Sequence, residues 1–296
     1  MALESFRDYL VTHDRSERTI AGYLYAAERF DRWLRAQGED GLSPQNLTAE
    51  DVRAFRQNLA EQGAQPSTLN AYLAALRAYA SWCVEAGLLQ SDPLRWLHST
   101  REQALAPKWL THKEQSAVVR EAERALAAAR TEAKRLDAQR DLSLIVLLLN
   151  TGLRISEACE LEPGDAELHE RSGRLTVRSG KGAKRRVLPL NRAARQALAD
   201  WMALRPAGAA TLFTTTLGKP FNYAAAYRRL AELGRRAKVA LHPHTLRHTF
   251  AKNLVDSGVG LEQVAALLGH ESLNTTRVYT IPSQQDLERA VSHLDF

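Results

Sequence analysis

The segment HTLRHTF, from His244 to Phe250, places two histidines and an arginine within five positions of a predicted helix. Histidines four residues apart share a helix face and could bind a metal ion. Here, however, Arg247 puts a fixed positive charge between them, and the glutamate of a zinc-protease helix is missing. A histidine and an arginine three residues apart, at a helix start that Pro243 helps to define, are better suited to an anion. The segment favours phosphate binding, although a capped surface helix would show the same pattern.

Three further motifs carry residues suited to phosphate chemistry. TGLRISE contains Arg154, the turn GKGAKRR contains Lys181 between two glycines, and LLGHESLNTTRVYT contains His270 and, nine residues later, Tyr279. Each residue also has a simpler explanation. Arg154 could pair with Glu157 on a helix, Lys181 could be a solvated turn residue, His270 could cap a helix, and Tyr279 could be a packed aromatic.

Taken in this order, the motifs resemble the catalytic signature of the tyrosine recombinases, the phage-integrase superfamily, and most of all its Xer-type bacterial members. The resemblance covers nearly the whole chain. It implies a site-specific DNA recombinase in which a tyrosine forms a 3′-phosphotyrosyl bond, releases a 5′-hydroxyl and exchanges strands through a Holliday junction. It implies no metal, cofactor or ATP. The residues that match the signature are Arg154, Lys181, His244, Arg247, His270 and Tyr279.

The residue types fit this chemistry. A phenol is a better leaving group than a serine hydroxyl when the step reverses, because its unperturbed pKa is near 10. Arg154 and Arg247 can stabilise charge on the transferring phosphate, a task that metals perform elsewhere. Lys181 on a hairpin tip is the expected general acid. His244 and His270 are expected to transfer the tyrosine proton or to hold the phosphate.

Several neighbours compete for these roles. Lys184, Arg185 and Arg186 follow Lys181 closely, and one of them could hold backbone phosphates instead. The tyrosines 223 and 227 lack a Gly-His motif at the expected distance. Glu157 and His248 resemble supporting residues in the family pattern rather than catalytic ones.

The first hundred residues are predicted to form a helical domain. SERTIAGYLYAAERFDRWLRAQG has apolar residues at helical spacing and ends at Gly38. A second helix begins after Thr48, with Asp51 in a capping box, and a third runs from Pro66 to Gly87. With a short segment near residues 3–10, this predicts about four helices, the core-binding (SAM-like) domain that the resemblance also implies.

The part of the chain after the first hundred residues is predicted to contain both helices and strands. The expected division is a core-binding domain at 1–99, a linker at 100–108 and a catalytic domain at 109–296. A capping box at Thr111 opens the last part, and LSLIVLLLNTGL predicts a buried helix that ends at Gly152. RLTVRSGKGAKRRVLPL predicts a hairpin. The fold class is therefore mainly α, with a mixed α+β catalytic domain and a small antiparallel sheet.

Two segments suggest protein contacts. The stretch 120–140 is longer and more charged than expected for a small member of the family, and it could be an extended helix or an exposed connection used in protein contacts. The C-terminal SQQDLERAVSHLDF fits an amphipathic helix, and the resemblance implies that such a helix docks on a neighbouring subunit. The expected assembly is four protomers, identical or with a related recombinase, on two double-stranded DNA sites.

Charge and composition agree with a nucleic-acid partner. Residues 1–99 carry a net charge of −3 and residues 100–296 a net charge of +9, which places most of the attraction for a polyanion in the second part. Two cysteines give no disulfide framework, the N-terminus lacks a signal-peptide pattern, and the run LSLIVLLL is too short to span a membrane. The expectation is a cytoplasmic protein without membrane contacts.

Three other functions compete with recombination. A catalytically inactive or regulatory DNA-binding relative would not need Tyr279. A single-subunit topoisomerase would use the same active-site chemistry without a preferred sequence. A metal-dependent hydrolase would lose its activity in a chelator.

Overall fold

The structure is a computed structural model that describes residues 2–101, 108–178, 185–270 and 272–280. The chain divides into two compact units, Met1–Ala104 and Leu105–Phe296, called here the N-terminal and C-terminal units. Each unit is described by itself. The predicted linker 100–108 crosses this division, and most of it lies outside the described residues.

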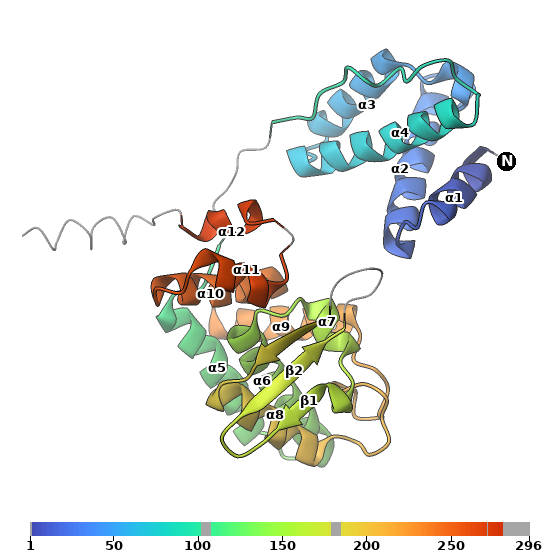
Figure 1. Ribbon diagram of the computed structural model, residues 1–296. Coiled ribbons are helices and arrows are strands. Elements are labelled where there is room, and N and C mark those ends of the chain that lie inside the picture. The colour runs from blue at the N-terminus through green and yellow to red at the C-terminus, as the bar shows by residue number, and fades with distance from the viewer. Residues whose placement is uncertain (1, 102–107, 179–184, 271, 281–296) are drawn as a thin grey trace, which may run out of the picture. The chain divides into compact units, whose positions relative to one another are not determined.

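The N-terminal unit is a helical bundle of α1 (Ala2–Thr12), α2 (Glu17–Ala36), the short 3-10 helix η1 (Pro44–Asn46), α3 (Ala49–Glu61) and α4 (Pro66–Glu85) (Figure 1). The predicted helix start at Thr48 is confirmed, because its side chain accepts a hydrogen bond from the backbone N–H of Asp51. Gly38 adopts φ +90° one residue beyond the C-cap of α2, which ends that helix as expected.

Aromatic side chains fill the core of this unit. Phe55 contacts Phe30 at a centroid distance of 5.1 Å and Tyr72 at 5.5 Å. At the other end of the bundle, Phe6 packs edge-on against Tyr79 at 5.2 Å. These offset and edge-to-face contacts hold α1, α2, α3 and α4 together.

The segment that follows α4 is tied back to the bundle. Arg56 donates to the backbone oxygen of His98 at 3.1 Å and to the hydroxyl of Thr100 at 2.6 Å. The side chain of Asn70 exchanges two hydrogen bonds with the backbone of Thr100, at 3.0 and 2.8 Å. Arg77 donates to the backbone oxygen of Leu97. Arg56 and Arg77 therefore bind the chain itself.

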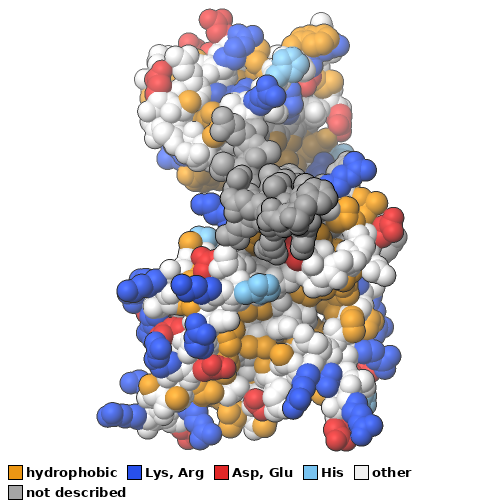
Figure 2. Space-filling model, turned by 90° about the vertical axis from the view of Figure 1, so that its left-hand side faces the viewer, with side chains coloured by type: hydrophobic (Ala, Val, Ile, Leu, Met, Phe, Trp, Pro, Cys, Tyr) orange, Lys and Arg blue, Asp and Glu red, His pale blue; other side chains and the backbone are white. Residues whose placement is uncertain are grey.

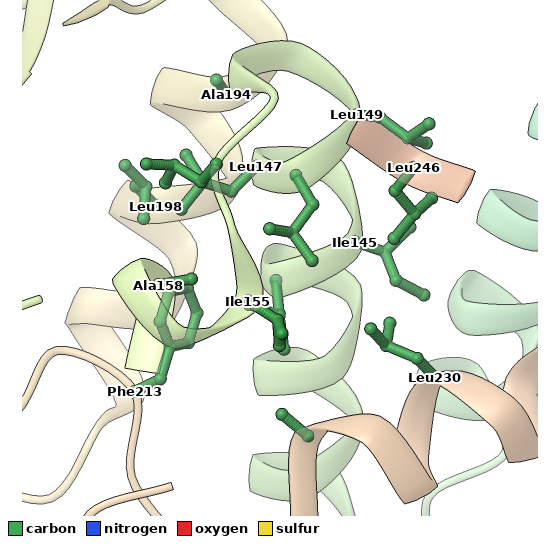
Figure 3. Close-up of a cluster of buried hydrophobic side chains, with 14 of the residues drawn as sticks. Ile145, Leu147, Leu149, Ile155, Ala158, Ala194, Leu198, Phe213, Leu230 and Leu246 are labelled. Atoms are coloured by element: carbon green, nitrogen blue, oxygen red, sulfur yellow. The ribbon is translucent and has the colours of Figure 1, made fainter. Parts of the chain in front are cut away.

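The C-terminal unit is built around one buried helix. The chain enters it through α5 (His112–Ala127), whose capping box between Thr111 and Glu114 is confirmed. The first turn of the central α6 (Glu132–Thr151) is exposed, whereas most residues from Ala138 to Thr151 are buried. Figure 3 shows apolar side chains from α7 (Ile155–Glu160), α8 (Arg192–Leu204), α9 (Tyr223–Ala237) and α10 (Pro243–Asp256) converging on α6.

A small antiparallel sheet lies beside this helical core, and the predicted mixed fold is confirmed. Its strands are β1 (Ala166–Leu168), β2 (Gly173–Val177) and β3 (Arg186–Pro189) in the order β1-β2-β3, with the short η2 (Pro163–Asp165) before them. The hairpin prediction covered β2 and β3 but not β1, which is only three residues long. Of the residues between β2 and β3, 179–184 lie outside the described residues.

The charged stretch 120–140 is not one extended helix. It is broken between α5 and α6, and its last residue is buried. Arg140 binds Asp141 at 2.7 Å and lies over the ring of Phe221 at 3.8 Å from the centroid. Asp141, only 3% exposed, is also bound by Arg229 at 2.6 Å. This end of the stretch thus belongs to the core and joins α6 to α9.

The described chain ends with α11 (Leu261–Leu268), the four-residue α12 (Asn274–Arg277) and the 3-10 turn η3 (Val278–Thr280). The predicted C-terminal helix in 283–296 lies outside the described residues. Within the described chain, no helix combines the length and apolarity that crossing a membrane requires. Lys and Arg side chains gather on the visible face of the C-terminal unit, with fewer acidic ones between them (Figure 2).

Candidate active site

The turn between α6 and α7 positions Arg154. Gly152 ends α6 in the left-handed conformation, at φ +62°, so the chain reverses and Arg154 becomes the N-cap residue of α7. The Glu157 carboxylate accepts the backbone N–H of Arg154 at 2.8 Å and its guanidinium at 2.9 Å. The Arg154 side chain remains 43% exposed. Its guanidinium is therefore oriented by Glu157 and still open to a ligand.

Glu157 joins Arg154 to a second arginine on the sheet. Arg186 of β3 donates to the two carboxylate oxygens of Glu157 at 2.9 and 2.7 Å, in a bidentate pair. Burial raises the pKa of Glu157, but hydrogen bonds from Arg186 and from the backbone of Arg154 outweigh it, and the pKa lies below its ordinary value. Glu157 is therefore ionised at neutral pH and holds two cations side by side.

Arg247 lies on α10 and is only 4% exposed. Its guanidinium donates to the backbone oxygen of Gly152 at 2.7 Å and to that of Leu268 at 2.8 Å. These are carbonyl groups at the C-terminal ends of α6 and α11, where a cation is favoured. Burial, with Arg154 nearby, lowers the pKa of Arg247 to about 10, so it stays protonated at pH 7.

His270 follows the left-handed C-cap Gly269 of α11. Its Nδ1 lies 2.8 Å from the hydroxyl of Thr276. Burial, followed by the charges of Arg247, Arg154 and Arg186, lowers its pKa to about 4. His270 is therefore a neutral imidazole that lies within the field of all three arginines.

Tyr279 lies on η3 and packs among apolar residues of α10 and α11, including Phe250 and Leu268. It is only 2% exposed. Its hydroxyl lies 2.7 Å from Nδ1 of His248. Burial raises the pKa of Tyr279, although the charge of Arg247 acts in the opposite direction.

Four of the six predicted residues belong to one cluster, because Arg154, Arg247, His270 and Tyr279 interact through hydrogen bonds or through their charges. His244 lies on the exposed side of α10, with its ring 6.3 Å from that of His248. Lys181 lies outside the described residues. The alternative explanation of Arg154, its pairing with Glu157, is present in the structure. Its role in binding phosphate stays a prediction.

Arg186 and His248 make contacts within the cluster that their sequence motifs did not predict. Arg186 was one of three candidates for contacts with the DNA backbone, yet it is bound to Glu157. Alternation along β3 contains the signal, since Arg186 lies on the same side of the strand as the buried Leu188. His248, expected to be a support, is the residue that contacts the Tyr279 hydroxyl.

The rival explanations find less support in the geometry. Tyr223 and Tyr227 stack on each other at 6.2 Å, and Tyr227 stacks on His242 at 6.0 Å, all on the exposed surface. Over the described residues, no three His, Cys, Asp or Glu side chains form a group that could hold a metal ion. The cluster combines guanidinium groups with a phenol, which suits binding of a phosphodiester and attack on it.

Comparisons with known proteins show the family of this chain. The phage integrase family matches residues 108–286, and its N-terminal SAM-like domain matches residues 2–88. Tyrosine recombinase XerC of Corynebacterium efficiens is 34% identical over 98% of this chain and 89% of its own length. Tyrosine recombinase XerA of Pyrococcus furiosus is 31% identical over 98% of this chain and 92% of its own.

Solved structures share the fold. The XerH site-specific recombinase, bound to a palindromic difH substrate in a post-cleavage complex, superposes with a TM-score of 0.74 at 23% identity. That match covers 92% of this chain and 79% of the XerH chain. A lambda integrase fragment bound to a core site gives a TM-score of 0.73 at 15% identity, over 94% and 93% of the two chains.

Proposed function

This chain belongs to the phage integrase family and is a tyrosine recombinase; from that premise we propose how its own residues cleave and rejoin DNA. Tyr279 is the nucleophile, and Arg154 and Arg247 bind the phosphate under attack. The supporting observation is that one helix serves both tasks. Arg247 and His248 are consecutive on α10, and His248 contacts the Tyr279 hydroxyl at 2.7 Å.

The reaction proceeds in two transesterifications. The Tyr279 oxygen attacks phosphorus, a 3′-phosphotyrosyl bond forms, and the bond from phosphorus to the 5′-oxygen breaks. Arg154 and Arg247 stabilise the charge that develops on the non-bridging oxygens, and the neutral His270 donates a hydrogen bond to one of them. Lys181, outside the described residues, protonates the leaving 5′-oxygen.

A 5′-hydroxyl from the partner duplex then attacks the phosphotyrosyl bond, restores the tyrosine and joins the exchanged strand, which produces a Holliday junction. The bond energy is kept in the covalent link, so the exchange consumes no ATP. Four protomers on two DNA sites complete the reaction. The net charge of +9 on residues 100–296 supplies most of the salt-dependent affinity for DNA.

The test is the detection of covalent protein–DNA adducts that survive denaturation. The wild type and Tyr279→Phe are expressed in bacteria that carry the flanking DNA of the gene, and DNA that remains bound after denaturing washes is sequenced. Adducts at discrete positions in the wild type alone are the expected result. Adducts that persist in Tyr279→Phe would refute this nucleophile.

A matched control is Tyr227→Phe, which removes an exposed phenol of the same unit and leaves the cluster intact. It is expected to form adducts at the wild-type level. Adducts without a preferred position, together with relaxation of supercoiled DNA, would indicate a topoisomerase. Wild-type protein that binds its site without forming adducts would indicate an inactive DNA-binding relative.

A further inference from the structure

The Tyr279 hydroxyl, which must lose its proton when it attacks the phosphate, lies next to the ring nitrogen of His248. Throughout the described ranges, the hydrogen bond of Tyr279 is the one with His248 Nδ1, at 2.7 Å, and the two rings lie 5.6 Å apart. The two histidines expected from the sequence are occupied differently. His270 uses its Nδ1 for Thr276 at 2.8 Å, and His244 lies on the exposed side of α10, with its ring 6.3 Å from that of His248.

The surroundings keep His248 neutral. Burial, then the charges of His244 and Arg247 on its own helix, lower its pKa. From the other elements packed against it, Tyr279 on η3 and His270 after α11 face the same space. A neutral imidazole carries one nitrogen lone pair, so His248 can accept a proton through Nδ1 when its own proton lies on Nε2.

Tyr279 needs such an acceptor. An ordinary phenol is ionised in only about one molecule in 10³ at pH 7, and burial raises the pKa of Tyr279 further. Attack by the neutral phenol would place a positive charge on its oxygen. Removal of the proton during attack avoids both the rarity of the ionised phenol and the positive charge on its oxygen.

We propose that His248 is a catalytic residue, the proton acceptor for Tyr279 in DNA cleavage. As the tyrosine oxygen bonds to phosphorus, its proton moves to Nδ1 of His248, and the 5′-oxygen leaves with a proton from the general acid. When a 5′-hydroxyl attacks the phosphotyrosyl bond, His248 returns the proton to the departing phenol, and the hydroxyl proton recharges the acid. The inference rests on the proposed function, since it assigns a role in the same step.

The position of His248 on α10 places the proton acceptor next in sequence to Arg247, the residue that binds the phosphate. Tyr279 is 2% exposed, and its hydroxyl lies 2.7 Å from Nδ1 of His248. Because His248 follows Arg247 directly on α10, the helix fixes the distance between the proton acceptor and the arginine that binds the phosphate. The proton acceptor and the phosphate-binding arginine therefore lie on one helix, and the acceptor already contacts the Tyr279 hydroxyl.

The experiment measures single-turnover cleavage of a nicked duplex that carries the site mapped by adduct sequencing. Two versions are compared, one with the natural 5′-oxygen and one with sulfur at the 5′-bridging position, because a thiolate leaves without a general acid. His248→Gln is expected to be about 10²- to 10⁴-fold slower than wild type at pH 7 on both substrates. Lys181→Ala is the matched control, and sulfur is expected to restore its rate.

Glutamine separates proton transfer from simple positioning, since its amide can hydrogen-bond the phenol but cannot take the proton. The rate of His248→Gln is expected to rise about tenfold per pH unit as the tyrosine ionises, whereas the wild type levels off once His248 is neutral. A Gln variant within about threefold of wild type at pH 7, far less than a lost general base costs, would overturn the proposal. So would full rescue by the sulfur substrate.

The outcome remains decisive if His248→Gln fails to bind DNA. A more acidic fluorotyrosine at position 279 of the otherwise wild-type chain should then leave the rate nearly unchanged, because the acceptor removes the dependence on phenol ionisation. A rate that follows the phenolate fraction would overturn the role of His248. Absence of adducts in wild type would instead refute the proposed function itself.

Discussion

Replacement of Glu157 by glutamine tests whether one carboxylate holds the arginines of the site together. The side chain is 8% exposed and accepts the bidentate pair from Arg186, which is itself 13% exposed, at 2.9 and 2.7 Å. Each carboxylate oxygen accepts from both arginines, so glutamine keeps one contact from each and turns its NH₂ group toward one donor of Arg154 and one of Arg186. Loss of one partner of a buried ion pair costs about 3–5 kcal/mol, and the remaining exposure of Arg186 favours the lower end.

The expected loss is therefore about 3 kcal/mol, which lowers the melting temperature of a unit of this size by about 6–12 °C. Scanning calorimetry on the full chain at pH 7 measures it. Glu167→Gln is the matched control. Its pair with Arg174 has the same chemistry at 2.8 Å, but the side chains are 49% and 64% exposed, so a loss of about 0.5 kcal/mol is expected.

The pH dependence provides a second check. Because the folded pKa of Glu157 is depressed, its stabilisation is complete above the unfolded pKa of about 4.3 and is lost as pH falls through the lower folded value. The difference between wild type and Glu157→Gln should be constant from pH 7 to 5 and shrink below about pH 4. A difference that is no larger than that of Glu167→Gln, or one that persists unchanged at pH 3, would refute the reasoning.

Two further substitutions address the frame around the cluster. Gly152→Ala should destabilise the C-terminal unit by about 2–4 kcal/mol in urea denaturation. Its φ is +62°, and the new methyl group would overlap the ring of Phe250 and lie 2.9 Å from Leu268 Cδ2. An unchanged denaturation midpoint would contradict this. Arg247→Lys should slow single-turnover cleavage by about 10²-fold or more, because one ammonium cannot reproduce both carbonyl bonds and a phosphate contact; cleavage at the wild-type rate would show that the fork geometry is not required.

Local signals in the sequence were reliable for the helices. The starts at Thr48 and Thr111 depend on side chains that bond the backbone three residues later, and the end of α6 depends on a single glycine. Such contacts are visible in the sequence because they close within one helical turn. The break between α5 and α6 was missed because the stretch around it is rich in helix-forming Ala, Glu and Arg.

The site was predictable only where a residue type and its motif carried the information. The pairing of Glu157 with Arg186 spans 29 residues and that of His248 with Tyr279 spans 31. Both depend on how β3, α7, α10 and η3 pack, which no local pattern records. The predicted roles of Lys181 and of the C-terminal helix lie outside the described residues and stay predictions.

The bonds of Arg247 to the ends of α6 and α11 have a consequence for how such chains evolve. A protein that lost recombination but kept its fold would remain under selection to retain this arginine, because its removal leaves two carbonyl groups unsatisfied beside a closed core. Tyr279, which gives up a single hydrogen bond when it becomes phenylalanine, carries a far smaller folding constraint. Among decayed copies, the tyrosine should vanish first, so an intact arginine is weak evidence of activity and an intact tyrosine is strong evidence.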